Sequence, residues 1–353
     1  MLLSQCILVS RTVNLNKCKD KVSGIKLNNS SAQSNYTLLI RFFKTHQIGE
    51  FISSIQKLLT DIVNFDSPYI IVDRTNWKRG SKNINLLTIG GLLQDVFVPN
   101  MWIQLDKRGN SNFDDRKYLI ERFVSLLTRK TNNITNRILL ADREFIGKKW
   151  FEYLKSENLH FVIRLKANMY FDLCSESGKK RTPLKAFNKY IEQYGIYAIP
   201  MELEGIRYSF VMIKNPKYDP KEPYIYFISD MLDAKAIANH YLKRWKIECA
   251  FKHLKTNGFN LEDANFKCDN KIELLMTVIV FVYTLAIKEG LLNKRTIKMK
   301  TFANQKRYPA TSIFRHGYSV LQTNCIHIID LLILIAKYLP MKSTNLHENT
   351  IFV

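Results

Sequence analysis

The sequence contains little cysteine, and none of it is arranged for cross-linking or for zinc. Six cysteines are scattered over 353 residues without a CxxC pair, and no Cys/His spacing suits a structural zinc ion. The seven histidines form no HExxH group. We therefore expect neither a disulfide framework nor a zinc site, and we assign no metal-binding role to any histidine.

Long apolar runs are also missing. The longest, 272–287 and 329–339, fall short of the ~20 residues that a membrane span needs, so both are predicted to be core helices. The N-terminus has no basic segment before its short apolar run, which argues against a secretory signal. These features predict a protein of the reducing cytoplasm with no membrane partner.

Acidic residues are outnumbered by basic ones. The chain has 31 Asp and Glu against 53 Lys and Arg, a formal net charge of +22. Because such an excess opposes compaction, it is most easily understood if a polyanion neutralises part of it, and nucleic acid is the first candidate. Hydrophobic residues make up 46% of the chain, enough for a sizeable core, and the length predicts two or three structural units.

The apolar periodicity predicts an α/β fold. Residues 1–66 are predicted to be helical, with one amphipathic helix over about 36–65. From Pro68, three β-rich runs separated by turn residues predict a meander of three strands. A helix is predicted over 112–130, followed by a wholly apolar strand at 138–141 of the kind that is buried on both faces.

From residue 147 onward, predicted helices again alternate with segments rich in β-formers. A helix is predicted over 147–158, and residues 160–228 are rich in β-formers, which predicts a strand-rich insertion. Residues 233–256 predict one long helix with Asp233 as its N-cap.

The C-terminal segment carries charge of one sign. Between Glu289 and Asp330 there are seven Lys and Arg and no acid. They are Lys294, Arg295, Lys298, Lys300, Lys306, Arg307 and Arg315. Such a run is either a DNA-contacting surface or a solvated, Lys-rich tail.

Two aspartates stand in matching positions. Asp73 ends the run YIIVD and Asp142 ends ILLAD, so each directly follows a predicted strand. Ligands collect beyond the carboxyl ends of parallel strands, and adjacent strands lie ~4.8 Å apart, so the two carboxylates converge if their strands are neighbours. Such a pair favours a hard cation, Mg²⁺ or Mn²⁺. Taken singly, either aspartate also fits an ordinary turn.

The long helix presents four polar groups on one face. At about 100° per residue, Tyr241, Arg244, Glu248 and Lys255 fall within an arc of about 60°. The face fits either part of a three-carboxylate site or a solvated surface stabilised by the Arg244–Glu248 pair.

Three further residues have two interpretations each. Trp245 adjoins the polar face and fits either stacking on a displaced base or a core position. Arg143 and Arg164 flank or parallel the strand that ends at Asp142, and they fit either a phosphate contact or a structural ion pair.

These residues together resemble a known family. DRTNW at Asp73, ADREF at Asp142 and the helix YLKRWKIECAFKHLK are similar to the DDE transposases of the insertion-sequence-four family. Their signature is Tyr, two residues, Arg, three residues, Glu, six residues, Lys, and the four residues of the helix face match every interval. The resemblance covers about 68–290, and FVIRLK at 161–166 looks like the strand that opens the β insertion of this family.

The resemblance implies a ribonuclease-H-like core, a mixed sheet flanked by helices, with a β-rich insertion between the second Asp and the Glu and a small helical N-terminal region. It divides the chain into an N-terminal region that binds inverted repeats, two parts of the catalytic core separated by the insertion, and a basic C-terminal region. In order, these are 1–66, 67–159, 160–228, 229–290 and 291–353.

The resemblance also implies a reaction. Asp73, Asp142 and Glu248 would be catalytic residues and ligands of two divalent ions, Mg²⁺ or Mn²⁺, for cleavage at transposon ends and transfer of the 3′-hydroxyl to target DNA. Tyr241, Arg244 and Lys255 are expected to contact DNA. The expected partners are terminal inverted repeats, target DNA and a second copy in a synaptic homodimer, associated with the nucleoid. The alternative is an inactive or domesticated DNA-binding descendant of such an enzyme.

Overall fold

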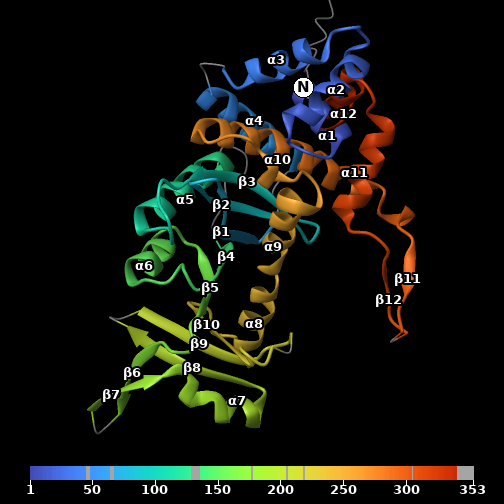
Figure 1. Cartoon of the computed structure of the whole chain (residues 1–353). Helices are drawn as coiled ribbons and strands as arrows, with labels where there is room; N and C mark the ends of the chain where they lie inside the picture. The colour runs from blue at the N-terminus through green and yellow to red at the C-terminus, as the bar shows by residue number, and fades with distance from the viewer. Residues whose placement is uncertain are drawn as a thin grey trace, which may run out of the picture.

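A single sheet forms the centre of the molecule. The computed structural model describes residues 1–44, 48–63, 67–128, 136–175, 178–203, 206–217, 219–303 and 305–339. Within them, eight strands form one mixed sheet in the order β3-β2-β1-β4-β5-β10-β9-β8 (Figure 1). The predicted mixed α/β class is confirmed.

The first three strands form the predicted meander. They are β1 (Tyr69–Arg79), β2 (Lys82–Leu93) and β3 (Val96–Gln104), paired antiparallel. α5 (Phe113–Thr128) then leads to β4 (Ile138–Ala141), which pairs in parallel with β1 and is buried along its whole length, as its apolar sequence predicts. The last two residues of the helix predicted over 112–130 lie outside the described residues.

The parallel part of the sheet continues into the segment predicted as an insertion. β5 (His160–Leu165) lies parallel to β4, and α6 (Lys148–Ser156) forms the connection between them. β10 (Tyr224–Ser229) then pairs antiparallel with β5. The predicted boundary at residue 160 therefore separates two strands that are neighbours in the sheet.

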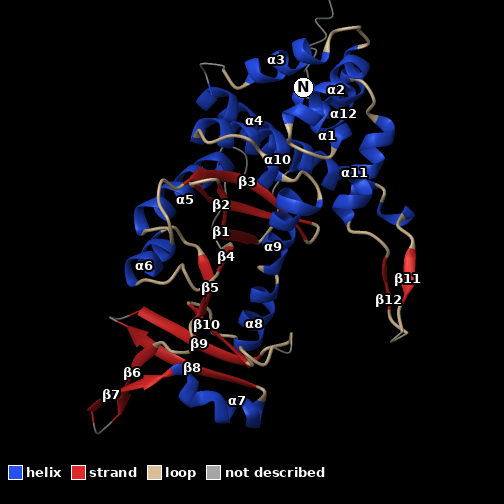
Figure 2. Ribbon diagram, viewed as in Figure 1, coloured by secondary structure: helices blue, strands red, loops and turns tan. Residues whose placement is uncertain are grey.

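Beyond β10 the sheet extends into a separate end of the molecule, where strands predominate (Figure 2). Its remaining elements are β6 (Tyr170–Ser175), β7 (Gly178–Pro183), the 3₁₀ turn η1 (Leu184–Phe187), α7 (Asn188–Tyr194), β8 (Ile196–Leu203) and β9 (Ile206–Lys214). β6 and β7 form a hairpin of their own.

The helix predicted over 233–256 is interrupted, so the expectation of one long helix is wrong. It consists of α8 (Ala234–Leu242), α9 (Trp245–Lys252) and a π-helical turn, η2 (His253–Asn257). At the junction, the N–H groups of Lys243 and Arg244 bond carbonyls three residues back, which is tighter than the α-helical pattern. The predicted N-cap is confirmed, because Asp233 accepts hydrogen bonds from two N–H groups of the first turn.

Helices from both ends of the chain form one layer over the meander end of the sheet (Figures 1 and 2). They are α1 (Leu2–Ser10), α2 (Leu15–Lys26), α3 (Ala32–Phe42), α4 (Ile48–Val63), α10 (Asp269–Leu292), α11 (Ile313–Asn324) and α12 (Ile328–Tyr338). The helix expected over 36–65 is therefore two helices, α3 and α4. Tyr318 and Gln322 of α11 donate to the carbonyls of Ile7 and Leu8 at 3.0 and 2.8 Å, which joins the two ends.

The two apolar runs differ in burial. α10 is the one described helix long and apolar enough to cross a membrane, yet 89% of its apolar window is buried inside the protein, as a core helix requires. α12 is not a core helix, contrary to prediction. It buries Leu331 and Ile335 but leaves Ile329 and Ile333 59% and 63% exposed, because it packs on the surface of the layer by one stripe.

Two glycines allow α10 and α11 to cross closely. A Cβ at Gly317 would overlap the carbonyl oxygen of Ala286 and the backbone of Gly290, and a Cβ at Gly290 would overlap the carbonyl of Ile313. Small residues are required here because backbone atoms, which cannot move aside as side chains do, fill the space.

Gly317→Ala should therefore lower the free energy of unfolding by ~1–3 kcal/mol, through overpacking at this crossing. Gly24→Ala in α2 is the matched control, since a Cβ there meets nothing within 4 Å, and it should stabilise the protein by ~0.5–1 kcal/mol. Urea unfolding of both variants measures the difference. If both substitutions change the free energy of unfolding by the same amount, the crossing of α10 and α11 can accommodate a Cβ and the explanation is wrong.

Candidate active site

Asp73 and Asp142 lie side by side at the centre of the sheet. Ile71 of β1 is in register with Leu140 of β4, so the positions two residues further along are these two aspartates. Side chains two residues apart on a strand lie on the same face, so both carboxylates project to one side. This register is the one that the predicted convergence requires, and the charge of Asp142 acts on the Asp73 carboxyl.

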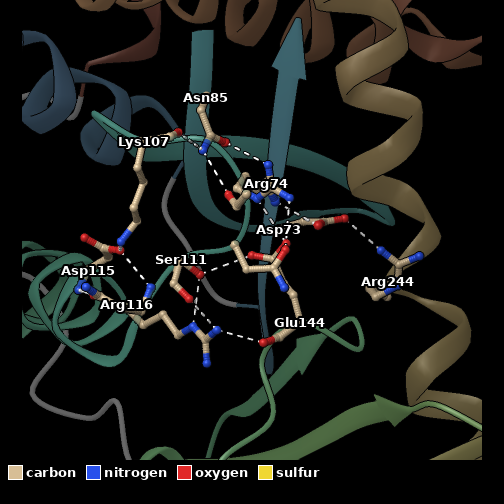
Figure 3. Close-up of polar contacts among 12 residues, drawn as sticks. Asp73, Arg74, Asn85, Lys107, Ser111, Asp115, Arg116, Glu144 and Arg244 are labelled. Atoms are coloured by element: carbon tan, nitrogen blue, oxygen red, sulfur yellow. Dashed lines mark hydrogen bonds and ion pairs between the residues drawn. The ribbon is translucent and has the colours of Figure 1, made fainter. Parts of the chain in front are cut away.

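Arg244 connects Asp73 to the helix side of the site. Its Nη1 donates to Asp73 Oδ2 at 2.8 Å, and its Nη2 donates to Glu248 Oε1 (Figure 3 shows the Asp73 contact). The Arg244 side chain is only 7% exposed, so this helix face is not a solvated surface. Arg244 Nε is buried and has no hydrogen-bond partner among the described residues.

Tyr241 forms the corresponding link to the second aspartate. Its hydroxyl donates to Asp142 Oδ1 at 3.4 Å, and its ring packs 4.7 Å from that of Phe227 and 5.5 Å from the Arg244 guanidinium carbon. Burial raises the pKa of this hydroxyl far above its usual range, so it remains a donor. Asp73, Asp142 and Glu248 are thus tied together through two residues of one helical segment.

Lys255 lies apart from these acids. Its Nζ donates to the carbonyl of Asn76 at 2.9 Å, forms an ion pair with Glu262 at 3.1 Å, and lies 5.7 Å from the ring centre of Trp77. Lys255 is in the π-helical turn, and at a rise of about 1.5 Å per residue its seven-residue separation from Glu248 puts it about 10 Å further along the helix axis. Lys255 therefore contacts β1 three residues beyond Asp73.

Charge is concentrated around Asp73. Burial raises the pKa of the Asp73 carboxyl to about 7, and the nearby Asp142 and Glu144 act in the same direction, against the opposing effects of Arg244 and the Arg74 N–H. Desolvation thus outweighs the ion pair. An added cation at this point would be stabilising.

The carboxylate oxygens at this position are the type of ligand that binds a hard divalent ion. Asp73 and Asp142 offer neighbouring carboxylate oxygens, the ligands that Mg²⁺ and Mn²⁺ prefer. In the described part of the chain, however, no group of three or more His, Cys, Asp or Glu is gathered closely enough to hold a metal ion. Glu248 is instead ion-paired with Arg244.

A second polar network supports Asp73 from the other side and was not predicted from the sequence (Figure 3). Arg74 Nε pairs with Glu144 Oε2 at 3.0 Å, and Glu144 Oε1 accepts from Ser111 at 3.1 Å. Arg116 donates to the Ser111 hydroxyl at 2.9 Å and to the Glu144 carbonyl at 2.7 Å. The available signal was the acid of ADREF, two residues after Asp142, together with the arginine of DRTNW, one residue after Asp73.

Arg143 and Arg164 share one partner that was also missed, Glu222. They bind its two carboxylate oxygens at 2.7 Å each. All three line a cavity of about 360 Å³ that also contains Lys166 and Lys221. Arg143 Nε lies 3.9 Å from Asp142 Oδ1, so the cavity adjoins the site.

Trp245 is not a core residue. Its side chain is 48% exposed, and Lys217 Nζ lies 2.9 Å from its ring centre. About half of this side chain is therefore in contact with solvent, and one ring face is already used by a cation–π contact.

Comparison with known proteins assigns the chain to a family. The family model described as the transposase DDE domain matches residues 65–285, more than half of the chain, so the chain belongs to the DDE transposase family. Among solved structures, it is similar to a cryo-EM structure of a piggyBac transposase synaptic complex with hairpin DNA, with 11% identity over 99% of this chain and 77% of that one and a TM-score of 0.42. A likeness of this degree identifies no shared ligand. No curated protein matches the sequence.

The raised pKa of Asp73 predicts a pH trend in stability. Because its pKa is about 7 in the folded protein and about 3.9 in an unfolded chain, its contribution to stability is complete below pH ~4 and is lost as the pH rises through about 7. The free energy of unfolding of Asp73→Asn, relative to that of the unmodified protein, should therefore rise between pH 4 and pH 8. Urea unfolding with chelator present measures both proteins.

Asp95→Asn is the control with the opposite sign. Although burial acts the other way, hydrogen bonds from Lys243 and Lys246 lower the pKa of Asp95, so its contribution is lost on acidification. This variant should lose stability relative to the unmodified protein as the pH rises to about 5, where the carboxyl ionises in both states, and should show little further change up to pH 8. Parallel trends in the two variants would contradict the assignment to Asp73.

Proposed function

We propose that this chain is a DNA transposase that cleaves phosphodiester bonds at transposon ends and joins the 3′-hydroxyl to target DNA by two-metal in-line transesterification. Family membership supports the reaction class. The observation that carries the proposal is the Arg244 guanidinium, which bonds both Asp73 and Glu248 beside Asp142. It supports a single site to which all three acids of the motif belong.

In this proposal Asp73, Asp142 and Glu248 hold two divalent ions, Mg²⁺ or Mn²⁺. When bound, such ions activate the attacking oxygen and stabilise the leaving oxygen of an in-line displacement. The chain itself fixes the geometry of the carboxylates, because sheet register aligns Asp73 with Asp142 and the ion pair with Arg244 orients Glu248.

The cations of the site are proposed to bind DNA. Arg244 would reach a phosphate oxygen only when its ion pairs with Asp73 and Glu248 open, and Tyr241 beside it can donate its hydroxyl. Lys255 would bind a phosphate further along β1. Trp245, which is half exposed, would stack on a base.

The remaining expectations complete the proposal. The strand order β3-β2-β1-β4-β5, antiparallel and then parallel, supports a ribonuclease-H-like core of the insertion-sequence-four type. The helical region 1–66 would bind the terminal inverted repeats, and two copies of the chain would pair the transposon ends in a synaptic homodimer. The enzyme would act in the cytoplasm, on the nucleoid.

Glu248→Gln should reduce cleavage by about 1,000-fold, because a metal-binding charge worth several kcal/mol in the transition state is removed. DNA binding should change little. Both are measured with DNA from the two flanks of this gene, by strand cleavage in Mg²⁺ and by gel shift.

Glu50→Gln in α4 is the matched control, since Glu50 is exposed and far along the chain from the motif. It should cleave as the unmodified chain does, and chelator should stop cleavage by both. Cleavage by Glu248→Gln at the normal rate would contradict the catalytic assignment. Binding without cleavage by the unmodified chain would favour the inactive descendant.

Glu222→Gln should bind DNA about three- to tenfold more tightly and with a steeper salt dependence, because Arg143 and Arg164 would become available to phosphates. Glu192→Gln, which removes an exposed acid paired with Lys214 at the far end of the sheet, is the control. Equal affinities for the two variants would assign Arg143 and Arg164 to a structural ion pair.

A further inference from the structure

A thin ribbon projects from the helical layer (Figure 1). It is formed by β11 (Met299–Thr301) and β12 (Arg307–Pro309), a two-stranded antiparallel pair that joins no other sheet. We call residues 298–309 the arm. Every described residue of the arm is exposed, so it has no core of its own. Isolated two-stranded ribbons are at best marginally stable in water, which indicates that the arm is completed by a partner.

The base of the arm, by contrast, is fixed. The N–H of Ala310 donates to the carbonyl of Lys298 at 2.7 Å and closes the ribbon. Next to it, His316 Nε2 on α11 lies 2.8 Å from Thr296 Oγ1 and 3.1 Å from the carbonyl of Asn293, at the end of α10. The arm is therefore an exposed ribbon on a rigid support rather than a loose loop.

One face of the arm combines cations with aromatic rings. Lys300 pairs across the ribbon with Tyr308, and strand alternation puts Lys298 and Phe302 on the same side. The rings of Phe302 and Tyr308 meet edge to face with centroids 5.5 Å apart, yet they remain 52% and 47% exposed. Exposed aromatic rings among lysines are typical of surfaces that bind nucleic acid.

Charge selects the partner. The arm carries Lys298, Lys300, Lys306 and Arg307, and no acid occurs between Glu289 and Asp330. A second copy of this chain has a net charge of +22 and would repel the arm, whereas a DNA duplex would neutralise it. The major groove of B-DNA admits a two-stranded ribbon, so the shape fits as well.

We propose that the arm is a DNA-binding element that lies along a groove of duplex DNA, with Lys298 and Lys300 on phosphates and the Phe302–Tyr308 pair against the sugars and base edges. The inference rests on the proposed function, because it takes transposon or target DNA as the partner. It adds a contact outside the site of Asp73, Asp142 and Glu248, on a segment beyond the residues matched by the family model.

The test compares duplex binding by three variants of the full chain over a range of salt concentrations. Lys298→Glu/Lys300→Glu should weaken binding at least about tenfold and lower the slope of log affinity against log salt by about 2, one unit per lost phosphate contact. Phe302→Ala/Tyr308→Ala should weaken binding with little change in slope, because no charge is removed. Lys149→Glu/Lys155→Glu on α6, both exposed, changes the net charge equally and should bind nearly as the unmodified chain does.

Hydrogen exchange gives a local readout, since the amides of β11 and β12 should become protected when duplex is added. No described residue of the arm is buried, so both arm variants should melt at the temperature of the unmodified chain. If the unmodified chain binds DNA and both arm variants bind equally well, the proposal for the arm fails while the proposed function stands. If an arm variant changes only the oligomeric state, a second copy is the partner and the proposal is overturned. If the unmodified chain binds no duplex, both the proposed function and the proposal for the arm are contradicted.

Discussion

The candidate site depends on the sharing of one guanidinium. Asp73 and Glu248 come from a strand and a helix that are far apart in the sequence, and both bond Arg244 in a nearly buried position. Carboxylates gathered in a poorly solvated pocket repel one another strongly unless a cation lies among them. Arg244 supplies that cation, and the Tyr241 hydroxyl ties the same helical segment to Asp142. The contacts that hold α8 and α9 beside the sheet are therefore the same contacts that bring the three acids together.

Local sequence patterns, namely apolar runs and helical spacing, predicted much of this arrangement. The two aspartates converge because each follows an apolar strand, and the strands pair in register as neighbours. Tyr241, Arg244 and Glu248 gather because helical spacing survives the tightened junction at Lys243. Lys255 does not join them, because a shared helix face aligns side chains in direction only, and seven residues separate Lys255 from Glu248 by about 10 Å along the axis.

Partners contributed by distant segments were beyond prediction. Glu222, which binds both Arg143 and Arg164, lies in the segment before β10, and nothing in its local sequence marks it as their partner. Burial of α12 could not be predicted either, because an apolar composition does not determine how many neighbours a helix has. In each case the missing information is a contact between elements, whereas the strands, most helices and the neighbouring aspartates follow from periodicity.

The helical layer has a consequence for how the molecule is made. Its bonds from Tyr318 to Ile7 and from Gln322 to Leu8 join residues 311 and 314 positions apart. Contacts this distant close slowly, because the entropy of a long loop opposes them. During synthesis, α1 leaves the ribosome long before α11 exists, so its apolar side must wait without its final neighbour. We therefore expect folding to finish only after translation of α11, with the nascent amino-terminal helices dependent on chaperones until then.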